Sequence, residues 1–399
     1  MKIKIVTETQ QRGTFATMLL LYKKLLEYGI DAQLYTTFSS EYMTLPSPPK
    51  SMIFGYEKMV NSENYARKIF NIIHNSKDTV IHLANAMYGI LPIAEKSGAK
   101  TVINIQYWWP TCYFNSMDNP YCDCQSLTKI SRCIYNKKNG YHKILSPLEA
   151  LYAKWKLDKI KEYVSKASII LAVSNIVKEV LVSRGFPEDK IRVININAIT
   201  PPIDYVEYHP SDSFTFAYIS YPDQGKGIFQ LLKAFSIALK YNEKIRLKIA
   251  GGLEEPKVVE TISELGIKDK VVLTKRFPYT EYINKMKELL SDVDVVVVPT
   301  LVPDTWARVV TESMLSGRPV MVTKGNGGLV EQVTDGVDGF HVNVYDVNDF
   351  ALSLYNISQI PRNKIEEMGK IARSNILKKY DNKKIIDQVI SLYRELIET

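Results

Sequence analysis

The chain has 399 residues, of which 46% are hydrophobic and 24% are charged. This length exceeds that of one typical core, so we expect two to three domains of an ordinary soluble globular protein. The sequence opens as a strand, MKIKIVTET, and no apolar run approaches the roughly 18 residues that a membrane span needs. We therefore expect a cytoplasmic protein that at most touches the inner face of a membrane.

The net charge of +8 is concentrated in one stretch. Between Lys129 and Lys166 there are ten basic and three acidic residues, a local balance of +7. Such a run usually forms a solvated helix face. Contact with an anionic membrane surface is the alternative, because Tyr152, Trp155 and Tyr163 lie among the charges. No nucleic-acid-binding motif accompanies the run, so we expect no nucleic acid partner.

Strands and helices alternate through residues 1–197, which we interpret as the first lobe. Alternation of this kind predicts a parallel sheet with crossover helices. Residues 107–143 show little periodicity and are predicted to form an insertion or lid. The predicted strands are KIKIV, AQLYTT, TVIHLA, TVINIQ, SIILAVS and IRVININ, and the predicted helices lie near residues 15–28, 62–75, 90–96 and 176–184.

The insertion contains all four cysteines of the chain, Cys112, Cys122, Cys124 and Cys133. Their spacing lacks the paired C-x2-C knuckles of a zinc ribbon. A disulfide-stapled loop, a tetrahedral metal clip and free thiols are all compatible with this spacing. We expect the cysteines to have a structural rather than a catalytic role.

A linker is predicted over residues 198–212, which are rich in Pro, Asp and Ser. A second alternating series fills residues 213–380, the second lobe. Two doubly wound lobes of this kind place ligands at the carboxyl ends of strands. The predicted strands are FTFAYIS, IRLKIAG, VVLTKRF, VDVVVVP and PVMVT, and the predicted helices lie near residues 228–241, 257–265, 279–290, 306–316, 329–333 and 382–398.

The stretch PTLVPDTWARVVTESMLSGRPV, residues 299–320, carries two acids eight residues apart, Asp304 and Glu312. Asp304 and the residue after it offer an N-cap for the helix predicted over residues 306–316. The free N–H groups and positive dipole end of a helix N-terminus favour a phosphate or sugar oxygen as ligand. The structural alternative is that Asp304 only caps the helix and Glu312 pairs with Arg308 one turn earlier.

This spacing resembles the Glu-x7-Glu signature of the retaining glycosyltransferases of family four. Asp304 stands at the first acid, Glu312 at the second, and SMLSGRPV matches the ending of the family segment. The resemblance implies the α/β fold class GT-B, in which two doubly wound Rossmann-like lobes face each other across a cleft. It also implies that the closing helix, within residues 381–399, crosses back to the first lobe.

Two further segments of the second lobe match the family. The loop YPDQGKG ends in Lys-Gly and puts Lys226 where the family has a lysine that holds the donor diphosphate. A lysine suits that position because the departing diphosphate gains negative charge, although a lysine in a surface turn is the structural alternative. The segment Gly327–Val342 resembles the family's Gly-Gly-x-x-Glu-x-x-x-Asp-Gly-x-x-Gly loop, with Glu331 at a helix start.

The second lobe departs from the family pattern at one cation. Ser220 stands where the family often has an arginine as a second partner of the diphosphate. Arg276 and Lys275, at a neighbouring strand end, could substitute for it.

The first lobe departs further from the pattern. In INIQYWWPTC, Gln106 replaces a histidine of the family and Tyr107 an aspartate. Gln106 can still donate a hydrogen bond to a phosphate or sugar oxygen, but it cannot carry a proton or a charge. The Gly-Gly that usually follows the first strand is reduced to Gly13-Thr14.

The resemblance implies a retaining, metal-independent hexosyltransferase that moves a sugar from a UDP- or GDP-linked donor to a glycan or lipid-linked glycan, with no cofactor. The first acid and the amides after it would hold the sugar, the second acid would bind the ribose, and the acceptor would bind the first lobe near residues 106–109 and the cysteine loop. The catalytic residues implied are Lys226, Asp304 and Glu312, and the donor-binding residues are Gly13, Thr14, Gln106, Arg276, Phe277, Thr305, Trp306, Ala307 and Glu312.

Three alternatives are weighed against this reading. A nucleotide-sugar 2-epimerase of the same fold would need acid–base residues in the first lobe, and we identify none in the sequence. A nicotinamide dehydrogenase is disfavoured because no G-x-G-x-x-G follows a strand. A non-catalytic sugar- or nucleotide-binding relative is favoured by Ser220 and Gln106, which remove charge from the expected site.

Overall fold

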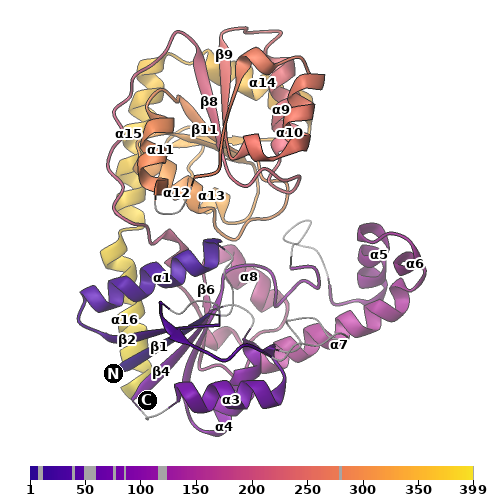
Figure 1. Cartoon of the computed structure of the whole chain (residues 1–399), viewed down its shortest axis with the longest axis vertical. Coiled ribbons are helices and arrows are strands. Elements are labelled where there is room, and N and C mark those ends of the chain that lie inside the picture. Colours follow the sequence, from indigo (N-terminus) through magenta and orange to yellow (C-terminus); the bar gives the residue numbers. More distant parts are fainter. Residues whose placement is uncertain are drawn as a thin grey trace. The chain divides into compact units, whose positions relative to one another are not determined.

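The computed structural model describes residues 1–7, 12–37, 41–48, 60–74, 78–84, 87–115, 124–277 and 281–398. The chain divides into two compact units (Figure 1). Unit 1 consists of Met1–Ile199 and Asn382–Thr399, and unit 2 of Thr200–Asp381. Unit 2 therefore begins inside the predicted linker, and residues 200–213 contain no helix or strand.

Unit 1 is built on a parallel sheet, as predicted. Among the described residues the strand order is β3-β2-β1-β4-β5-β6-β7. Every residue of β4 is buried, as expected for a central strand that is covered on both faces. The strands are β1 (Lys2–Thr7), β2 (Asp31–Thr36), β3 (Met43–Thr44), β4 (Thr79–Ala84), β5 (Lys100–Ile105), β6 (Ile169–Ala172) and β7 (Ile191–Val193).

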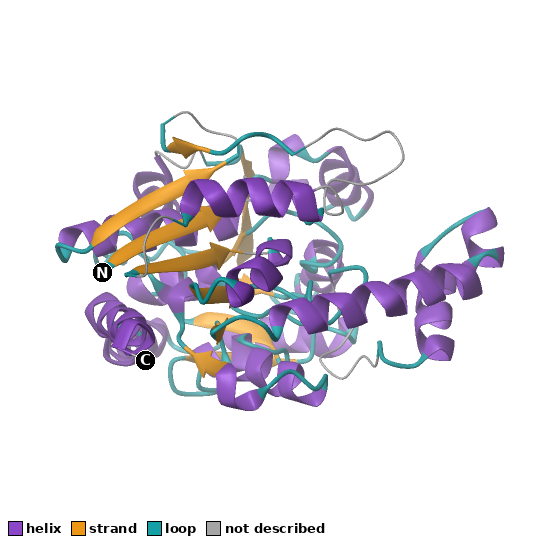
Figure 2. Cartoon of the chain, turned by 90° about the horizontal axis from the view of Figure 1, so that it is seen from below, coloured by secondary structure: helices purple, strands orange, loops and turns teal. Residues whose placement is uncertain are grey.

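Helices of unit 1 follow the strands as crossovers and flank the sheet (Figure 2). Residues 107–143, the predicted insertion, contain a helix that the sequence did not predict, α5 (Leu127–Lys137). The helix buries Ile130 and Ile134 and packs against α7, so tertiary contacts stabilise it. The helices are α1 (Arg12–Glu27), α3 (Glu63–Ile73), α4 (Leu91–Lys96), α5 (Leu127–Lys137), α6 (Tyr141–Ile144), α7 (Ser146–Val164) and α8 (Asn175–Ser183).

The cysteine-containing segment is described only in part. Cys112 and Cys124 are buried and Cys133 is partly buried, whereas Cys122 lies outside the described residues. The structural role expected for the cysteines stays a prediction.

The closing helix, α16 (Asn382–Glu398), belongs to unit 1 and packs on β4 and α1. At the centre of this contact the hydroxyl of Tyr393 shares a hydrogen bond with Nδ1 of His82, and both side chains are fully buried. Burial lowers the pKa of His82 to about 3, so its ring is neutral in the folded protein. The helix therefore sits on a buried, uncharged histidine.

Unit 2 has its own parallel sheet with strand order β10-β9-β8-β11-β12-β13 among the described residues. Phe216, Phe235 and Phe350 lie in its core. The strands are β8 (Phe214–Ile219), β9 (Ile245–Ala250), β10 (Val271–Thr274), β11 (Val295–Val298), β12 (Val320–Thr323) and β13 (Gly339–Val342), and the helices are α9 (Ile228–Ala238), α10 (Pro256–Glu264), α11 (Tyr282–Leu290), α12 (Arg308–Leu315), α13 (Leu329–Gln332), α14 (Val347–Ser358) and α15 (Arg362–Lys379).

Two doubly wound α/β units confirm the predicted fold class. Within the described ranges, no helix combines the length and the apolar character that crossing a membrane requires.

The buried histidine predicts an acid-sensitive unit 1. The pKa of His82 is lower in the folded than in the unfolded chain, so only the unfolded chain gains a proton as the pH falls below about 6.5, and stability is lost in that direction. We expect the free energy of unfolding to fall by about 2 kcal/mol more between pH 7 and pH 5 in wild type than in His82→Gln.

Urea unfolding followed by tryptophan fluorescence would measure this difference, because Trp108, Trp109 and Trp155 all lie in unit 1. His209→Gln, which changes a histidine of unit 2 whose side chain is 65% exposed, should keep the wild-type pH dependence. Identical pH dependence in wild type and His82→Gln would contradict the prediction.

Candidate functional site

The centre of the unit 2 sheet is a topological switch point. Strands β8 and β11 are neighbours there, and the strand order runs outward from them in opposite directions. In open parallel sheets ligands bind at the carboxyl ends of the strands where this reversal occurs. Lys226 lies in the loop after β8 and Asp304 in the loop after β11, so the topology brings together residues 78 positions apart in sequence.

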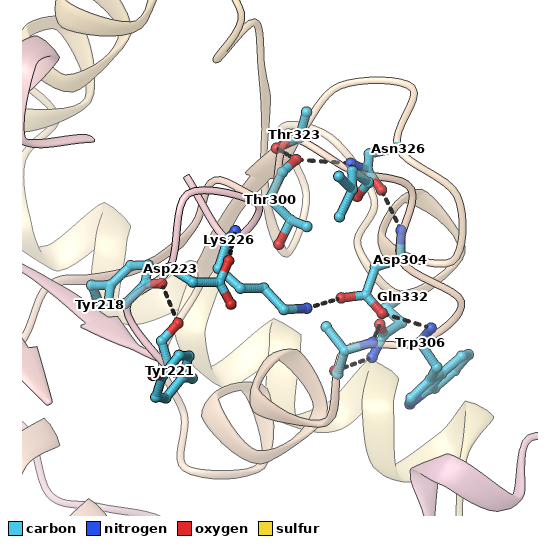
Figure 3. A network of polar contacts seen from close by, with 12 residues as sticks. Tyr218, Tyr221, Asp223, Lys226, Thr300, Asp304, Trp306, Thr323, Asn326 and Gln332 are labelled. Carbon is cyan, nitrogen blue, oxygen red and sulfur yellow. Dashed lines mark hydrogen bonds and ion pairs between the residues drawn. The ribbon is translucent and has the colours of Figure 1, made fainter. Parts of the chain in front are cut away.

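Lys226 and Asp304 form an ion pair at this point (Figure 3). The Lys226 Nζ lies 2.7 Å from Asp304 Oδ2, and the side chains are 35% and 12% exposed. Burial alone would lower the pKa of the Lys226 ammonium, but the Asp304 carboxylate, with help from Asp223, outweighs burial and raises it. Lys226 is therefore charged at neutral pH and remains partly accessible to an anion.

The backbone of the Lys226 loop is fixed by its neighbours. The Lys226 N–H donates to Asp223 Oδ1 at 2.8 Å, and the Gly225 carbonyl accepts from the Leu301 N–H at 2.9 Å. Gly227 has φ of +76°, and a Cβ there would lie 1.9 Å from the Pro299 carbonyl oxygen. The glycine after the lysine is thus required by the close approach of this loop to the end of β11.

The Asp304 loop is held by its own backbone contacts. The Asp304 N–H donates to Asn326 Oδ1 at 2.9 Å, and the Asp304 carbonyl accepts from the Gly328 N–H at 2.8 Å. The Asp304 carboxylate also accepts a 3.2 Å hydrogen bond from the Trp306 N–H. The loop therefore has one fixed conformation, with its carboxylate directed at Lys226 (Figure 3).

The helix after this loop begins later than the sequence predicted. Helix α12 starts at Arg308 rather than at residue 306, and its N-cap is Ala307, which makes no side-chain cap. Asp304 is not the N-cap because its carboxylate is engaged by Lys226 and by the Trp306 N–H. The Ala307 N–H donates instead to Gln332 Oε1 at 3.0 Å.

The GNGG turn, residues 325–328, packs backbone to backbone against the Asp304 loop. A Cβ on Gly327 would lie 2.3 Å from the Asp304 carbonyl oxygen, and one on Gly328 would lie 2.1 Å from that of Thr305. Asn326 fastens the turn to the end of β11, because its Nδ2 donates to the carbonyl of Thr300 at 2.8 Å. Gly327 and Gly328 are therefore required because a side chain at either position would collide with the backbone of the Asp304 loop.

Glu312 lies inside α12 and is 5% exposed. The Tyr282 hydroxyl donates to Glu312 Oε2 at 2.7 Å, and Arg308 Nη2 lies 3.4 Å from Oε1. Burial and the Glu312 carboxylate raise the pKa of Tyr282, so the phenol keeps the proton that it donates. The pairing of Glu312 with Arg308 that the structural alternative predicted is present, and Tyr282 is a second partner.

Arg276, the predicted substitute for the arginine that the family often has in place of Ser220, lies beside that position. The guanidinium of Arg276 stacks 4.5 Å over the ring of Tyr221, the residue after Ser220. Its nitrogens also lie 3.7 Å and 3.9 Å from carboxylates of Glu255 and Glu254, which partly balance its charge. The Phe277 ring lies 6.4 Å from that of Tyr282.

The remaining predicted residues belong to unit 1. Gly13 and Thr14 lie in the first turn of α1, the next described element after β1, and Gln106 follows β5 and is 5% exposed. Trp108 and Trp109 are 4% and 2% exposed, and Trp109 stacks on Tyr88. Both indole rings are therefore covered by protein rather than exposed as stacking faces for a sugar.

Sequence reasoning missed three residues that support the site. Asn326 and Gln332 hold the Asp304 loop, and Tyr282 holds Glu312. Asn326 lies one residue before the segment Gly327–Val342 that resembles the family, and Gln332 lies at a variable position within it, whereas nothing in the sequence marks Tyr282. Among the described residues, no group of three His, Cys, Asp or Glu side chains could hold a metal ion.

Two family models match the chain. Residues 204–375 match the model described as Glycosyl transferases group 1, and residues 12–195 match the model described as Glycosyltransferase Family 4. Together they cover the described parts of both units that carry the predicted site.

Two similar proteins illustrate the sequence likeness. A stretch of 179 residues, 42% of the chain, is 25% identical to lipopolysaccharide 1,2-N-acetylglucosaminetransferase of Salmonella typhimurium and covers 45% of that protein. A stretch of 151 residues, 36% of the chain, is 32% identical to D-inositol 3-phosphate glycosyltransferase of Mycolicibacterium smegmatis and covers 32% of it. The chain thus spans less than half the length of either relative.

Solved structures share the fold over nearly the whole chain. A glycosyltransferase from Rickettsia africae superposes with a TM-score of 0.69 at 16% identity, covering 100% of this chain and 99% of that one. Anabaena HepE in complex with UDP-glucose superposes with a TM-score of 0.69 at 16% identity, covering 99% of this chain and 100% of that one. The fold is GT-B, as the resemblance implied.

The close packing of the GNGG turn predicts a position-specific response to alanine. Gly327→Ala should cost about 1–3 kcal/mol more than Gly325→Ala, because both positions have positive φ but only at 327 would the new Cβ meet backbone. Urea unfolding of the full chain, followed by far-ultraviolet circular dichroism, would measure the two costs. Equal destabilisation by the two variants would show that the contact with Asp304 is not what requires the glycine.

Proposed function

The chain belongs to the family-four glycosyltransferases, and on that premise we propose that it is a retaining enzyme that transfers a sugar from a UDP- or GDP-linked donor. The observation that carries the proposal is the Lys226–Asp304 pair at the switch point of unit 2. A partly accessible ammonium beside a fixed carboxylate provides one group for a diphosphate and another for sugar hydroxyls.

Lys226 would hold the donor diphosphate and stabilise it as it leaves. The bond from the anomeric carbon to the diphosphate oxygen breaks in the reaction, so negative charge grows on that oxygen. The raised pKa of Lys226 keeps the ammonium charged throughout the neutral range. Arg276, next to the loop that carries Ser220, would provide a second positive charge.

Asp304 would orient the donor sugar by accepting hydrogen bonds from its hydroxyls. The backbone amides after Asp304 would contribute less to sugar binding than the family pattern implies, because the N–H groups of Trp306 and Ala307 already donate to Asp304 and Gln332. Thr305, Trp306 and Ala307 are at most 8% exposed. Their contribution would therefore be mainly to hold the carboxylate of Asp304 in place.

Glu312 would accept hydrogen bonds from the hydroxyls of the ribose. A carboxylate has about four acceptor positions, so the bonds from Tyr282 and Arg308 leave capacity for a diol. Those two contacts would hold the carboxylate in one orientation before the nucleotide arrives.

The reaction we propose retains the anomeric configuration. The acceptor hydroxyl would attack from the face on which the diphosphate leaves, and its proton would pass to the leaving oxygen. Among the described residues of the site, we assign no carboxylate to attack the anomeric carbon from the opposite face. The cations at the diphosphate would be side chains, so the mechanism requires no metal ion.

We propose a glycan or a lipid-linked glycan as the acceptor, bound to unit 1 near Gly13, Gln106 and residues 107–109. The printed name of the Salmonella typhimurium relative, a lipopolysaccharide N-acetylglucosaminetransferase, supports an acceptor of this class. A lipid-linked acceptor would bring the protein to the inner face of a membrane.

Removing the lysine charge should reduce transfer strongly. Lys226→Met should lower kcat by about 100- to 1,000-fold, the usual effect of removing one group that stabilises charge in the transition state. The assay measures UDP or GDP release from a panel of nucleotide sugars, with and without a lipid-linked oligosaccharide. Lys233→Met, an exposed lysine further along α9, should behave as wild type.

Two results would contradict the proposed transferase activity or the role of Lys226 in it. Tight nucleotide binding without release from any donor would favour the non-catalytic binding relative. Release that is equal in wild type and Lys226→Met would remove Lys226 from the mechanism.

The ribose role predicts a nucleotide-specific effect of Glu312→Gln. Loss of one charged acceptor should weaken UDP or GDP binding by about 10- to 100-fold, measured by isothermal titration calorimetry. Tyr282→Phe removes a protein partner of Glu312 without changing the carboxylate, so it should lower Tm but change nucleotide affinity much less. Parallel losses of Tm and affinity in both variants would assign Glu312 a structural role only.

A further inference from the structure

Helix α7 is apolar on two opposite faces. One face packs into unit 1 through Ala150, Ala153, Leu157, Ile160 and Val164. The opposite face carries four residues at helical spacing, Leu148, Leu151, Tyr152 and Trp155, whose exposed fractions are 65%, 54%, 43% and 51%. A surface helix normally presents polar residues to water, so an outward apolar face indicates a surface that is covered in the working protein.

The apolar surface continues beyond α7. Ile144, at the end of α6, is 81% exposed, and Leu145, between the two helices, is 44% exposed. We call Ile144, Leu145, Leu148, Leu151, Tyr152 and Trp155 the α6–α7 ridge. Both views show α5, α6 and the start of α7 extending away from the strands of unit 1 (Figures 1 and 2).

Positive charge surrounds the ridge. The stretch from Lys129 to Lys166 holds ten basic and three acidic residues, an excess of seven. Each of the three acids is paired with a lysine of the same stretch, as in the Lys154–Asp158 and Lys166–Glu162 pairs. The three acidic side chains are therefore each balanced by a neighbouring lysine, and seven further positive charges remain in this stretch.

Lysines and aromatic rings interleave on this surface. Lys159 lies 5.2 Å over the Trp155 ring and 5.3 Å over that of Tyr163, and Lys143 lies 5.0 Å over that of Tyr135. Membrane-interface segments combine the same elements: aliphatic side chains enter the acyl region, Trp and Tyr lie at head-group level, and lysine ammoniums meet lipid phosphates.

A hollow of about 1400 Å³ opens along the same side of α7, between that helix, α3, α4 and residues 113–115. Tyr152 and Trp155 belong to both the ridge and the hollow, whose lining also includes Lys156, Lys159 and Lys166. Lys156, Lys159 and Lys166 therefore lie beside the ridge, where they would meet lipid phosphates when the ridge enters the head-group region.

From these observations we infer that the α6–α7 ridge docks unit 1 on an anionic phospholipid surface. A second copy of the chain could also cover an apolar face, but two ridges would bring two excesses of seven positive charges together. An anionic bilayer covers the apolar side chains and neutralises the lysines at once. The inference does not rest on the proposed function, because docking needs neither donor nor acceptor.

Vesicle binding tests the inference directly. The full chain should co-sediment with vesicles of 70% phosphatidylcholine and 30% phosphatidylglycerol, and only weakly with pure phosphatidylcholine. Trp155 reports insertion, since it is 51% exposed while Trp108, Trp109 and Trp306 are at most 4% exposed. Its fluorescence maximum should shift to shorter wavelength on the anionic vesicles, and 0.5 M NaCl should reduce binding.

Paired variants separate the apolar from the charged contribution. Ile144→Ser with Leu148→Ser should weaken binding by about 10- to 100-fold, through loss of apolar burial. Lys154→Gln with Lys159→Gln should weaken it by about fivefold for each lysine and reduce the salt dependence. Val272→Ser with Leu352→Ser, exposed aliphatic residues of unit 2 at 51% and 52%, should bind as wild type does.

Three results would overturn the inference: no co-sedimentation with anionic vesicles, equal binding by the ridge and control variants, or concentration-dependent dimers that the ridge variant abolishes while vesicles bind to neither protein. Nucleotide release measured on the same preparations with a soluble acceptor keeps this outcome distinct from failure of the proposed function.

Discussion

Asp304 connects the parts of unit 2 that form the candidate site. Its N–H is held by Asn326, its carbonyl by Gly328 and its carboxylate by Lys226. Three segments far apart in sequence, the loops after β8 and β11 and the turn after β12, therefore meet at one residue. Because the backbone contacts at Gly227, Gly327 and Gly328 leave no room for a Cβ, this arrangement is fixed by sterics as much as by charge.

The arrangement has a consequence for ligand binding. In the structure Lys226 and Asp304 satisfy each other, so a diphosphate has to take over part of the lysine's hydrogen bonding and sugar hydroxyls part of the carboxylate's. Two preformed, mutually held charges cost little to reorganise when donor binds. Glu312 is prepared in the same way, by Tyr282 and Arg308.

The sequence predicted most of the described strands, because buried parallel strands are continuous apolar runs such as VVVV in β11, but it missed the short strands β3 and β13. It placed the start of α12 two residues early, since Asp304 carries a capping signal but uses its carboxylate for Lys226. Helix α14 was not predicted although Asp346 caps it through the N–H groups of Asn348 and Asp349, a signal that could have been read. Gln332 could not have been predicted, because its role depends on a contact with Ala307 that only the folded unit creates.

Helix α7 illustrates a different limit of sequence reasoning. The basic run was visible in the sequence, but the run alone is also typical of a solvated helix. Only the structure separates the buried face of α7 from the outward face that carries Leu148 and Trp155. Donor chemistry is thus proposed for unit 2 and membrane contact for unit 1, each on observations made within that unit.

The central claim is that Lys226 and Asp304 form the donor site. A crystal structure of the protein with a bound UDP- or GDP-sugar tests it most directly. We predict a diphosphate oxygen within about 3 Å of Lys226 Nζ and a sugar hydroxyl within the same distance of an Asp304 carboxylate oxygen. A donor bound with its diphosphate away from Lys226, and with the Lys226–Asp304 pair unchanged, would contradict the account.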